Sequence, residues 1–315
     1  MHNKYILSNV AGTFIFNEHL NLIDKKLFKN SEQYSAREGV EKEFCKRYKN
    51  LKKPETKELS RILSFFKKKK FFKAFHEINI KLARQAVKEA VKDDILAIQA
   101  VCSINEIDKS LNMLVKRLRE WYALYNPEFE NSLENQEKFV ELALKKSKKE
   151  LLKEIKVNEK DSMGAEFSNK DLDPVLNLAK DILGLYSLRK KQEEYLEGLM
   201  KGFCPNLLAV AGAAIGAKLI RQAGSLKSLM LFPASTIQLL GAEKALFRHM
   251  KSNARSPKYG FLHEHPLIAR NPKSMHGKIA RALADKISIA VKVDYFKGEP
   301  IGEKLKKELE KRFGK

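Results

Sequence analysis

The chain has 315 residues, enough for two or three domains, and 43% of them are hydrophobic, enough for a substantial core. Lysine and arginine outnumber aspartate and glutamate by 61 to 39, which gives a net charge of +22. Such an excess favours a polyanionic partner, above all nucleic acid, although a basic and well-solvated surface is the alternative. Residues 201–315 hold 22 Lys and Arg against 8 Asp and Glu, so we expect this third of the chain to contact phosphate.

Cysteine usage and hydropathy narrow the class further. Cys45, Cys102 and Cys204 lie far apart and form no C-x-x-C pair, so neither a disulfide framework nor a zinc site is expected. The N-terminus has no apolar signal-peptide core, and the longest apolar run, residues 207–217, is too short to span a bilayer. We therefore expect a cytoplasmic protein.

The first predicted element is a β-hairpin over residues 5–17, where two β-prone runs flank a turn that contains Asn9 and Gly12. Residues 31–50 and 55–66 are then predicted to be helical. Together they predict a small α/β domain over residues 1–87.

A long helix is favoured from Lys81 to Tyr125, because neither proline nor glycine interrupts this stretch. Its apolar residues alternate three and four apart, which is the heptad seam of a coiled coil. Asn126-Pro127 ends it, and residues 128–170 are polar and less regular. The seam residues are Ile104, Ile107, Leu111, Leu114, Leu118, Trp121 and Tyr125.

A second long helix is predicted to start near Asp171, with Pro174 in its first turn. Arg189 and Gln192 fall inside its seam, where polar residues weaken a coiled coil but can fix its register; alternatively, the phase is off by one and they face water. The two helices predict an antiparallel coiled-coil hairpin over residues 88–203, with self-association through its seams. The second seam contains Leu178, Ile182, Leu185, Arg189, Gln192, Leu196, Leu199 and Phe203.

The C-terminal third is predicted to be an all-helical domain over residues 204–300, beginning after the boundary at Cys204-Pro205-Asn206. Asn271 and Pro272 are predicted as the cap and first residue of a further helix. Its apolar face consists of Ile279, Leu283, Ile287 and Ala290. Residues 301–315 are predicted to form a basic helical tail.

Motifs for catalysis or cofactor binding are missing from the sequence. The segment Gly212–Leu219 has three residues between its glycines, where a P-loop needs four, and leucine follows Lys218 in place of Ser or Thr. The His263-Glu264-His265 triplet lacks metal-ligand spacing for a helix. We therefore expect no cofactor, no metal and no enzyme activity from this chain alone.

Candidate phosphate ligands surround Gly241. A break between two helices at Gly241 would expose backbone N–H groups at the start of the second helix, and helix N-termini attract phosphate. Glu243 argues against a pure phosphate cradle, although its carboxylate could order a neighbouring arginine or accept from a base edge. These residues by themselves fit two interpretations equally well, a basic helical surface and a specific RNA site. The candidate RNA contacts are Ser235, Thr236, Gln238, Gly241, Ala242, Glu243, Lys244, Arg248 and Lys251, followed by Lys218, Arg221, Lys278 and Arg281.

The segment from Phe232 to Met250, which contains Gly-Ala-Glu-Lys-Ala-Leu-Phe-Arg, resembles the signature of the Nop domain of archaeal scaffold proteins in box C/D guide-RNA particles. Four other stretches resemble the same family. They are residues 118–122 (Leu-Arg-Glu-Trp-Tyr), 162–166 (Ser-Met-Gly-Ala-Glu), 223–226 (Ala-Gly-Ser-Leu) and 277–284 (Gly-Lys-Ile-Ala-Arg-Ala-Leu-Ala).

This resemblance implies a non-catalytic scaffold in an archaeal cell. An N-terminal domain would bind fibrillarin, the 2′-O-methyltransferase, here through the hairpin residues Phe14 and Phe16. The coiled coil would form a homodimer, and the Nop domain would dock on guide RNA already held by a kink-turn-binding ribosomal-type protein. The region before the coiled coil is shorter than is usual for the family. The alternative is an autonomous RNA-binding or chaperone-like helical protein without a role in methylation.

Overall fold

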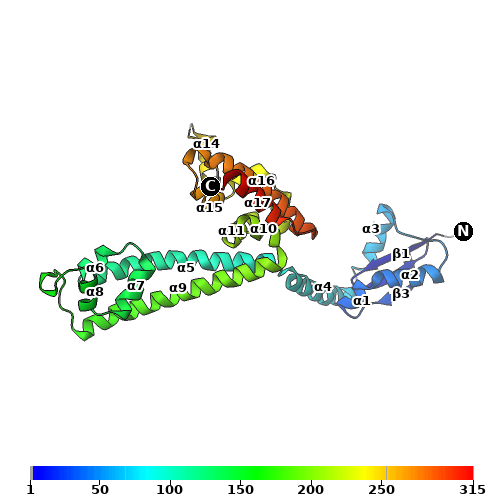
Figure 1. The fold of residues 1–315 in the computed structure, drawn as a ribbon. Coiled ribbons are helices and arrows are strands. Elements are labelled where there is room, and N and C mark those ends of the chain that lie inside the picture. Colours follow the sequence, from blue (N-terminus) through cyan, green and yellow to red (C-terminus); the bar gives the residue numbers. More distant parts are fainter. Residues whose placement is uncertain (1–2, 68, 253, 315) are drawn as a thin grey trace. The chain divides into compact units, whose positions relative to one another are not determined.

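The chain folds as two compact units, Met1–Lys92 and Asp93–Lys315, in a computed structural model that describes residues 3–67, 69–252 and 254–314 (Figure 1). The predicted fold class is confirmed: a small sheet with helices comes first, followed by a long helical hairpin and a compact helical domain.

The described part of the first unit contains a four-stranded mixed sheet in the order β3-β2-β1-β4, together with four helices. Its strands are β1 (Lys4–Asn9), β2 (Gly12–Phe16), β3 (Leu22–Leu27) and β4 (Leu51–Lys52), and its helices are α1 (Ser31–Ser35), α2 (Arg37–Arg47), α3 (Thr56–Phe65) and α4 (Lys69–Ala90). The predicted hairpin is confirmed, with Leu7 opposite Phe14. Strands β3 and β4 were not predicted, because β3 is mostly exposed and charged and β4 has only two residues.

The two faces of this sheet bury different clusters. On one face, Phe14 and Phe16 pack against Ile62, Phe66 and Phe71 of the α3–α4 region. On the other face, Ile6 and Ile15 pack against Phe44 of α2.

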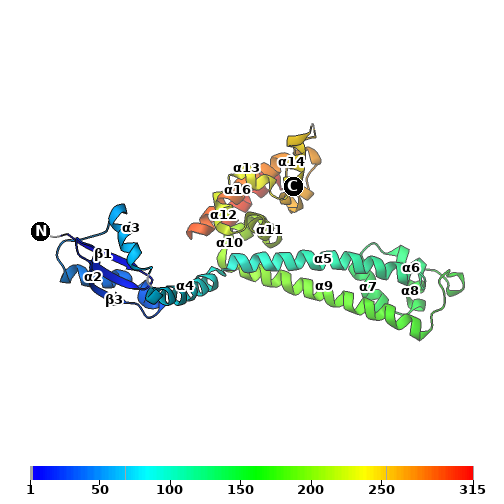
Figure 2. The same cartoon turned by 180° about the vertical axis from the view of Figure 1, so that it is seen from behind.

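The second unit begins with the helical hairpin, in which α5 (Asp93–Tyr122) and α9 (Asn169–Phe203) lie side by side (Figure 2). The stretch from Lys81 to Tyr125 is not one helix, because α4 ends at Ala90 and the acidic pair Asp93-Asp94 starts α5. Helix α9 starts two residues earlier than predicted, so Pro174 lies inside it, beyond the first turn.

Four predicted seam residues of α5, Ile104, Ile107, Leu111 and Leu118, are buried, but two other positions differ. Val115 and Tyr122 are buried where Leu114 and Trp121 were expected, because the buried positions follow the 3.6-residue period of a straight helix. Neither alternative for Arg189, a place inside the seam or a side chain that only faces water, describes the structure. The Arg189 Nε donates to Asp108 Oδ1 of α5 at 2.5 Å, a bond that raises the pKa of Arg189 and fixes the register of the hairpin.

The region 128–170, expected to be polar and less regular, forms short helices at the far end of the hairpin (Figures 1 and 2). They are α6 (Pro127–Ser132), α7 (Gln136–Lys145), α8 (Lys148–Glu154) and the 3-10 helix η1 (Glu159–Asp161). Asn126, Asn135 and Ser147 cap the first three through their side chains, so the sequence carried start signals that the prediction missed.

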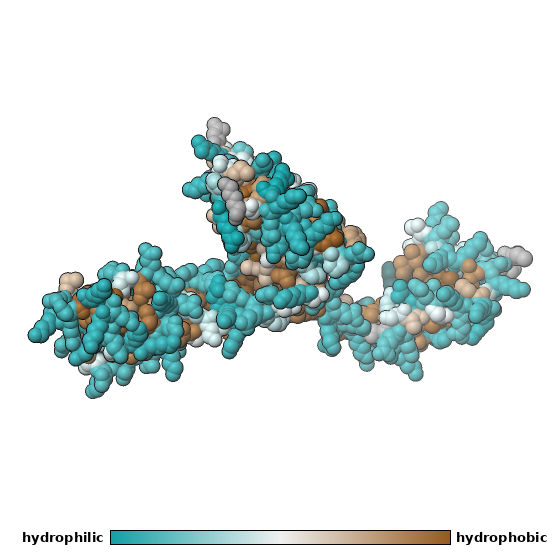
Figure 3. Space-filling model, viewed as in Figure 1, coloured by the Kyte–Doolittle hydropathy of each residue, from teal (hydrophilic) through white to brown (hydrophobic). Residues whose placement is uncertain are grey.

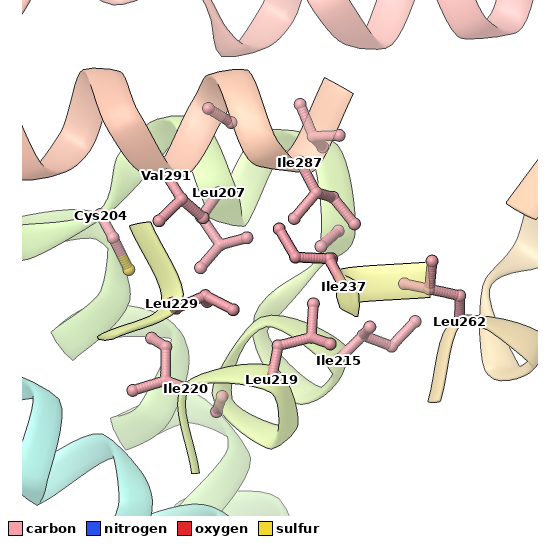
Figure 4. Close-up of a cluster of buried hydrophobic side chains, with 14 of the residues drawn as sticks. Cys204, Leu207, Ile215, Leu219, Ile220, Leu229, Ile237, Leu262, Ile287 and Val291 are labelled. Atoms are coloured by element: carbon pink, nitrogen blue, oxygen red, sulfur yellow. The ribbon is translucent and has the colours of Figure 1, made fainter. Parts of the chain in front are cut away.

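The C-terminal domain contains α10 (Pro205–Ala211), α11 (Ala213–Ala223), α12 (Leu226–Leu231), α13 (Ala234–Leu239), α14 (Glu243–Lys251), η2 (Phe261–Glu264), α15 (Pro266–Ala269), α16 (Lys273–Phe296) and α17 (Gly302–Phe313). Its core gathers Leu207, Leu219 and Ile287 from distant parts of the chain (Figure 4). The predicted apolar face of α16, including Ile279 and Leu283, is fully buried.

Two details of this domain differ from the prediction. Asn271 does not cap α16; Pro272 occupies the cap position, and the Asn271 amide donates to the backbone oxygens of Leu267 and Phe313. The basic tail is helical, as predicted, but its residues Leu305, Leu309 and Phe313 belong to the same hydrophobic core.

A network of buried hydrogen bonds, made by the side chains of Asp294 and Asn206, joins α10, α16 and α17. Both oxygens of Asp294, near the end of α16, accept from α10: Oδ1 from the backbone N–H and side-chain amide of Asn206, and Oδ2 from the Leu207 N–H. Asn206 Oδ1 in turn accepts from the N–H groups of Ile301 and Gly302 at 2.7 Å, where α17 begins. Burial raises the pKa of the Asp294 carboxyl, and the three donors oppose this shift. Each side chain thus caps a helix other than its own.

We predict that Asp294→Ala lowers the free energy of unfolding by about 2–4 kcal/mol, because it leaves buried N–H donors of α10 without an acceptor. Urea unfolding of the full chain, followed by circular dichroism, measures the change. The control is Asp285→Ala on the exposed face of the same helix, which we expect to shift stability by less than about 0.5 kcal/mol. Equal effects of the two substitutions would contradict this role for Asp294.

Candidate nucleic-acid interface

The predicted break between two helices at Gly241 is present, between α13 and α14. Gly241 has φ of +89°, which favours glycine, and a Cβ there would lie 2.8 Å from the ring atoms of Phe261. Two backbone hydrogen bonds hold the residues before this turn: the Gly260 N–H donates to Gln238 O, and the Phe261 N–H donates to Leu240 O. The segment that leads into the Gly241 turn is therefore hydrogen-bonded to the domain at residues 260 and 261.

Helix α14 carries the predicted cations on a surface with no buried residue. Lys244, Arg248 and Lys251 are exposed on it, together with large apolar side chains: 60% of Phe247 and 72% of Met250 are exposed. No described side chain caps its N-terminus. The Glu243 carboxylate accepts from the Gly241 N–H at 2.8 Å, so it stabilises the turn instead of ordering an arginine.

A groove of about 740 Å³ is lined by residues of α13, α16 and α17, beside the packing of α13 against α16. Ser235 and Gln238 line it from α13, and Lys278 and Arg281 line it from α16, so residues predicted as two separate sets meet at one site. The other lining residues are Ala234, Gly277, Ala282, Asp285 and Arg312. Thr236 is exposed on α13 but does not line the groove.

The remaining predicted cations, Lys218 and Arg221, lie on α11 outside this groove. Lys218 Nζ pairs with Glu264 at 2.5 Å, so its charge is partly neutralised within the domain. The Arg221 guanidinium lies 5.8 Å from the centre of the Phe261 ring, the ring that packs beneath Gly241. Arg221 therefore supports the turn and is a weaker candidate for direct RNA contact.

Sequence reasoning missed Arg312 and Asp285 as groove residues. Asp285 stands among the basic residues of α16 and belonged to none of the predicted sets of contact residues. Arg312 lies in the segment interpreted as a tail, and only the packing of α17 against α10 and α16 brings it to the groove.

The other predicted site residues lie far from this surface in the sequence, and their partners remain predictions. Ile104, Ile107, Leu111, Leu118, Ile182 and Leu196 are buried between α5 and α9 of the same chain or at the base of the hairpin, and Leu114 and Leu185 are partly buried there. Their apolar surface is thus consumed within one chain. Exposed apolar side chains of the hairpin include Met113, Leu124, Leu188 and Tyr195.

The assignment of a direct fibrillarin contact to Phe14 and Phe16 is corrected, because both side chains are 0% exposed in the core of the first unit. Large apolar side chains are nevertheless exposed on this unit, including Leu27 of β3 and Leu63 of α3. Figure 3 shows hydrophobic residues at the surface of this unit among hydrophilic ones. These can reach a partner where Phe14 and Phe16 cannot.

The sequence itself matches a family over most of this second unit: residues 103–315 match Nop, described as "snoRNA binding domain, fibrillarin". The chain belongs to the Nop family. The matched range contains the Gly241 turn, α14 and every lining residue of the groove.

Named members of the Nop family show clear identity to this chain. It is 42% identical over 257 residues to an uncharacterized NOP5 family protein of Methanocaldococcus jannaschii, covering 77% of this chain and 62% of that protein. It is 40% identical over 253 residues to nucleolar protein 56 of Dictyostelium discoideum, covering 73% and 47%. The chain thus spans less than two thirds of these relatives' length. A solved fibrillarin/Nop5p complex is similar at 27% identity and a TM-score of 0.45, covering 93% of this chain and 95% of that one.

Two further observations concern the described residues alone. They contain no group of three or more His, Cys, Asp or Glu side chains placed to hold a metal ion. Among the helices they form, none is long and apolar enough to cross a membrane.

We predict that Lys244→Ala and Arg248→Ala each weaken RNA binding by about 1–3 kcal/mol, if each side chain makes a charge-assisted phosphate contact. Each should also reduce the slope of log K against log salt by about 1. Gel-shift titrations at several salt concentrations, on RNA alone and on RNA with a kink-turn protein, measure both effects. Wild-type binding by both variants at every salt concentration would make residues 241–255 purely structural.

Proposed function

We propose that this chain is the non-catalytic scaffold of a box C/D ribonucleoprotein. It binds guide RNA together with a kink-turn-binding protein, and it positions fibrillarin for ribose 2′-O-methylation of a target RNA. The observation that carries this proposal is the Nop match over residues 103–315, combined with the exposed cationic helix α14 inside it.

The composition of α14 supports a composite partner. Phosphate contacts alone would require only its cations, but Phe247 and Met250 also expose large apolar surfaces between Lys244 and Lys251. Exposed apolar side chains beside charges are typical of protein interfaces with a polar rim. A surface made of RNA and a small protein together would cover both kinds of side chain, whereas naked RNA would leave the apolar ones in water.

Reconstitution with a box C/D RNA, omitting one protein at a time, tests this function. We expect methylation only when this chain, fibrillarin and the kink-turn protein are all present, and none from this chain alone. The competing hypothesis of an autonomous RNA-binding or chaperone-like protein predicts that fibrillarin does not co-purify with the chain.

Fibrillarin recruitment should depend on the exposed apolar residues of the first unit. We predict that Leu27→Asp combined with Leu63→Asp weakens co-purification of fibrillarin and leaves RNA binding unchanged, because both side chains are exposed on this unit. The matched control is Lys25→Asp, which places the same charge on a side chain that is already polar and exposed. Unchanged recruitment by the double variant would move the interface elsewhere.

Self-association is proposed through the outer surface of the hairpin, because the predicted seams are filled within one chain. Leu188 and Tyr195 lie seven residues apart on α9, and 42% and 49% of their side chains are exposed. We predict that Leu188→Asp with Tyr195→Asp yields monomers in light scattering at micromolar concentration, while helix content is unchanged. A monomeric wild-type protein under these conditions would end the proposal.

A further inference from the structure

The groove between α13, α16 and α17 combines charges that a phosphate site alone does not explain. Lys278, Arg281 and Arg312 supply three cations, while Asp285 supplies one carboxylate to the same cavity. No ion pair joins these groups to each other or to other side chains in the described parts of the chain. The cations are therefore available to an anion, and the carboxylate is available to a hydrogen-bond donor.

The remaining lining is made of small or neutral polar residues. Ala234, Gly277 and Ala282 present little side chain, which leaves apolar surface open to contact. Gln238 already donates its amide to Lys258 O at 2.6 Å, so its Oε1 is left as an acceptor. The Ser235 hydroxyl adds a group that can donate or accept.

We propose that this groove holds an unpaired nucleotide of the bound RNA, with its phosphates on Lys278, Arg281 and Arg312 and a nucleotide donor on Asp285. The ligand must carry both negative charge and a hydrogen-bond donor, because an acceptor-only carboxylate repels phosphate. In RNA, the available donors are the ribose 2′-hydroxyl and the N–H groups of unpaired bases. An unpaired nucleotide presents both, and a volume of about 740 Å³ is within the usual range of small-ligand sites.

Arg312 reaches this groove because α17 is fixed in place. Its N-terminus is capped by Asn206, and a Cβ on Gly302 would lie only 2.8 Å from the Asn206 Cα, so the two backbones are in close contact. At its other end, Phe313 is buried in the core, and the Arg312 guanidinium lies 5.1 Å from the centre of that ring. Lys286 of α16 pairs with Glu308 of α17 between these points. The arginine is therefore held at the groove by its helix.

This inference rests on the proposed function in one respect, that the ligand is RNA. The test is fluorescence anisotropy of the full chain with short single-stranded oligocytidylate, oligouridylate and oligodeoxycytidylate at several salt concentrations. We expect Arg312→Ala to weaken binding of the ribonucleotide probes roughly fivefold or more, with a salt slope smaller by about 1. The matched control is Lys311→Ala, which removes the same charge from an adjacent exposed residue outside the groove and should have a smaller effect.

Asp285→Ala distinguishes the source of the donor. Loss of a preference for RNA over DNA supports contact with the 2′-hydroxyl. Loss of a preference between cytosine and uracil supports contact with a base N–H group, the amino group where cytosine was preferred and N3–H where uracil was preferred. Uniformly tighter binding of all three probes would overturn the role of Asp285, because only repulsion would then have been removed. Equal effects of Arg312→Ala and Lys311→Ala would overturn the groove as a binding site.

Failure of this inference is separable from failure of the proposed function. If Lys244→Ala impairs assembly on a box C/D RNA but Arg312→Ala behaves like Lys311→Ala, the scaffold function stands and the groove is not a nucleotide site. If the wild-type chain fails to assemble on that RNA but binds oligonucleotides through Arg312, the groove proposal stands and the scaffold function falls. Thermal melting of Arg312→Ala confirms that the exposed substitution leaves the fold intact.

Discussion

The C-terminal domain depends on one buried polar interaction, the carboxylate of Asp294 bound to the start of α10. Helix α10 follows α9 after a single residue, and Cys204 at its cap position makes no side-chain bond. Asp294 supplies the missing acceptor from 88 residues further along the chain. Because the N–H groups of a helix N-terminus are costly to bury without a partner, this bond couples the hairpin's end to the core of the domain.

The same hydrogen-bond network determines which charged side chains line the groove. Asn206, held by Asp294, caps α17, and α17 carries Arg312 to the groove beside α16. The groove and α14 then form two separate cationic features of the domain, one recessed with a carboxylate and one exposed with apolar side chains. Different geometry at similar net charge suits different partners: a recess can select a single nucleotide, whereas a protruding helix can contact a larger composite surface.

The helical hairpin shows that the residues of a seam expected to mediate self-association can be buried within one chain. A three-and-four spacing records only that a helix has an apolar stripe, not which helix covers it. Here α9 covers the stripe of α5 within the chain, and the bond between Arg189 and Asp108 fixes how they align. The apolar side chains that the hairpin leaves exposed include Leu188 and Tyr195.

The sequence by itself determined the fold class, the first hairpin, the two long helices apart from the interruption after Ala90, the apolar face of α16 and the helix break at Gly241. These features arise from local preferences: alternation, helical periodicity, and the need for glycine at a positive φ. It also contained enough of the family's motifs to indicate Nop. Only the tertiary structure decided that Phe14 and Phe16 are buried, and that Lys278 and Arg281 share a groove with Ser235, Gln238 and Arg312. Such choices depend on contacts between residues far apart in the chain, and no local pattern specifies which helix a side chain will face.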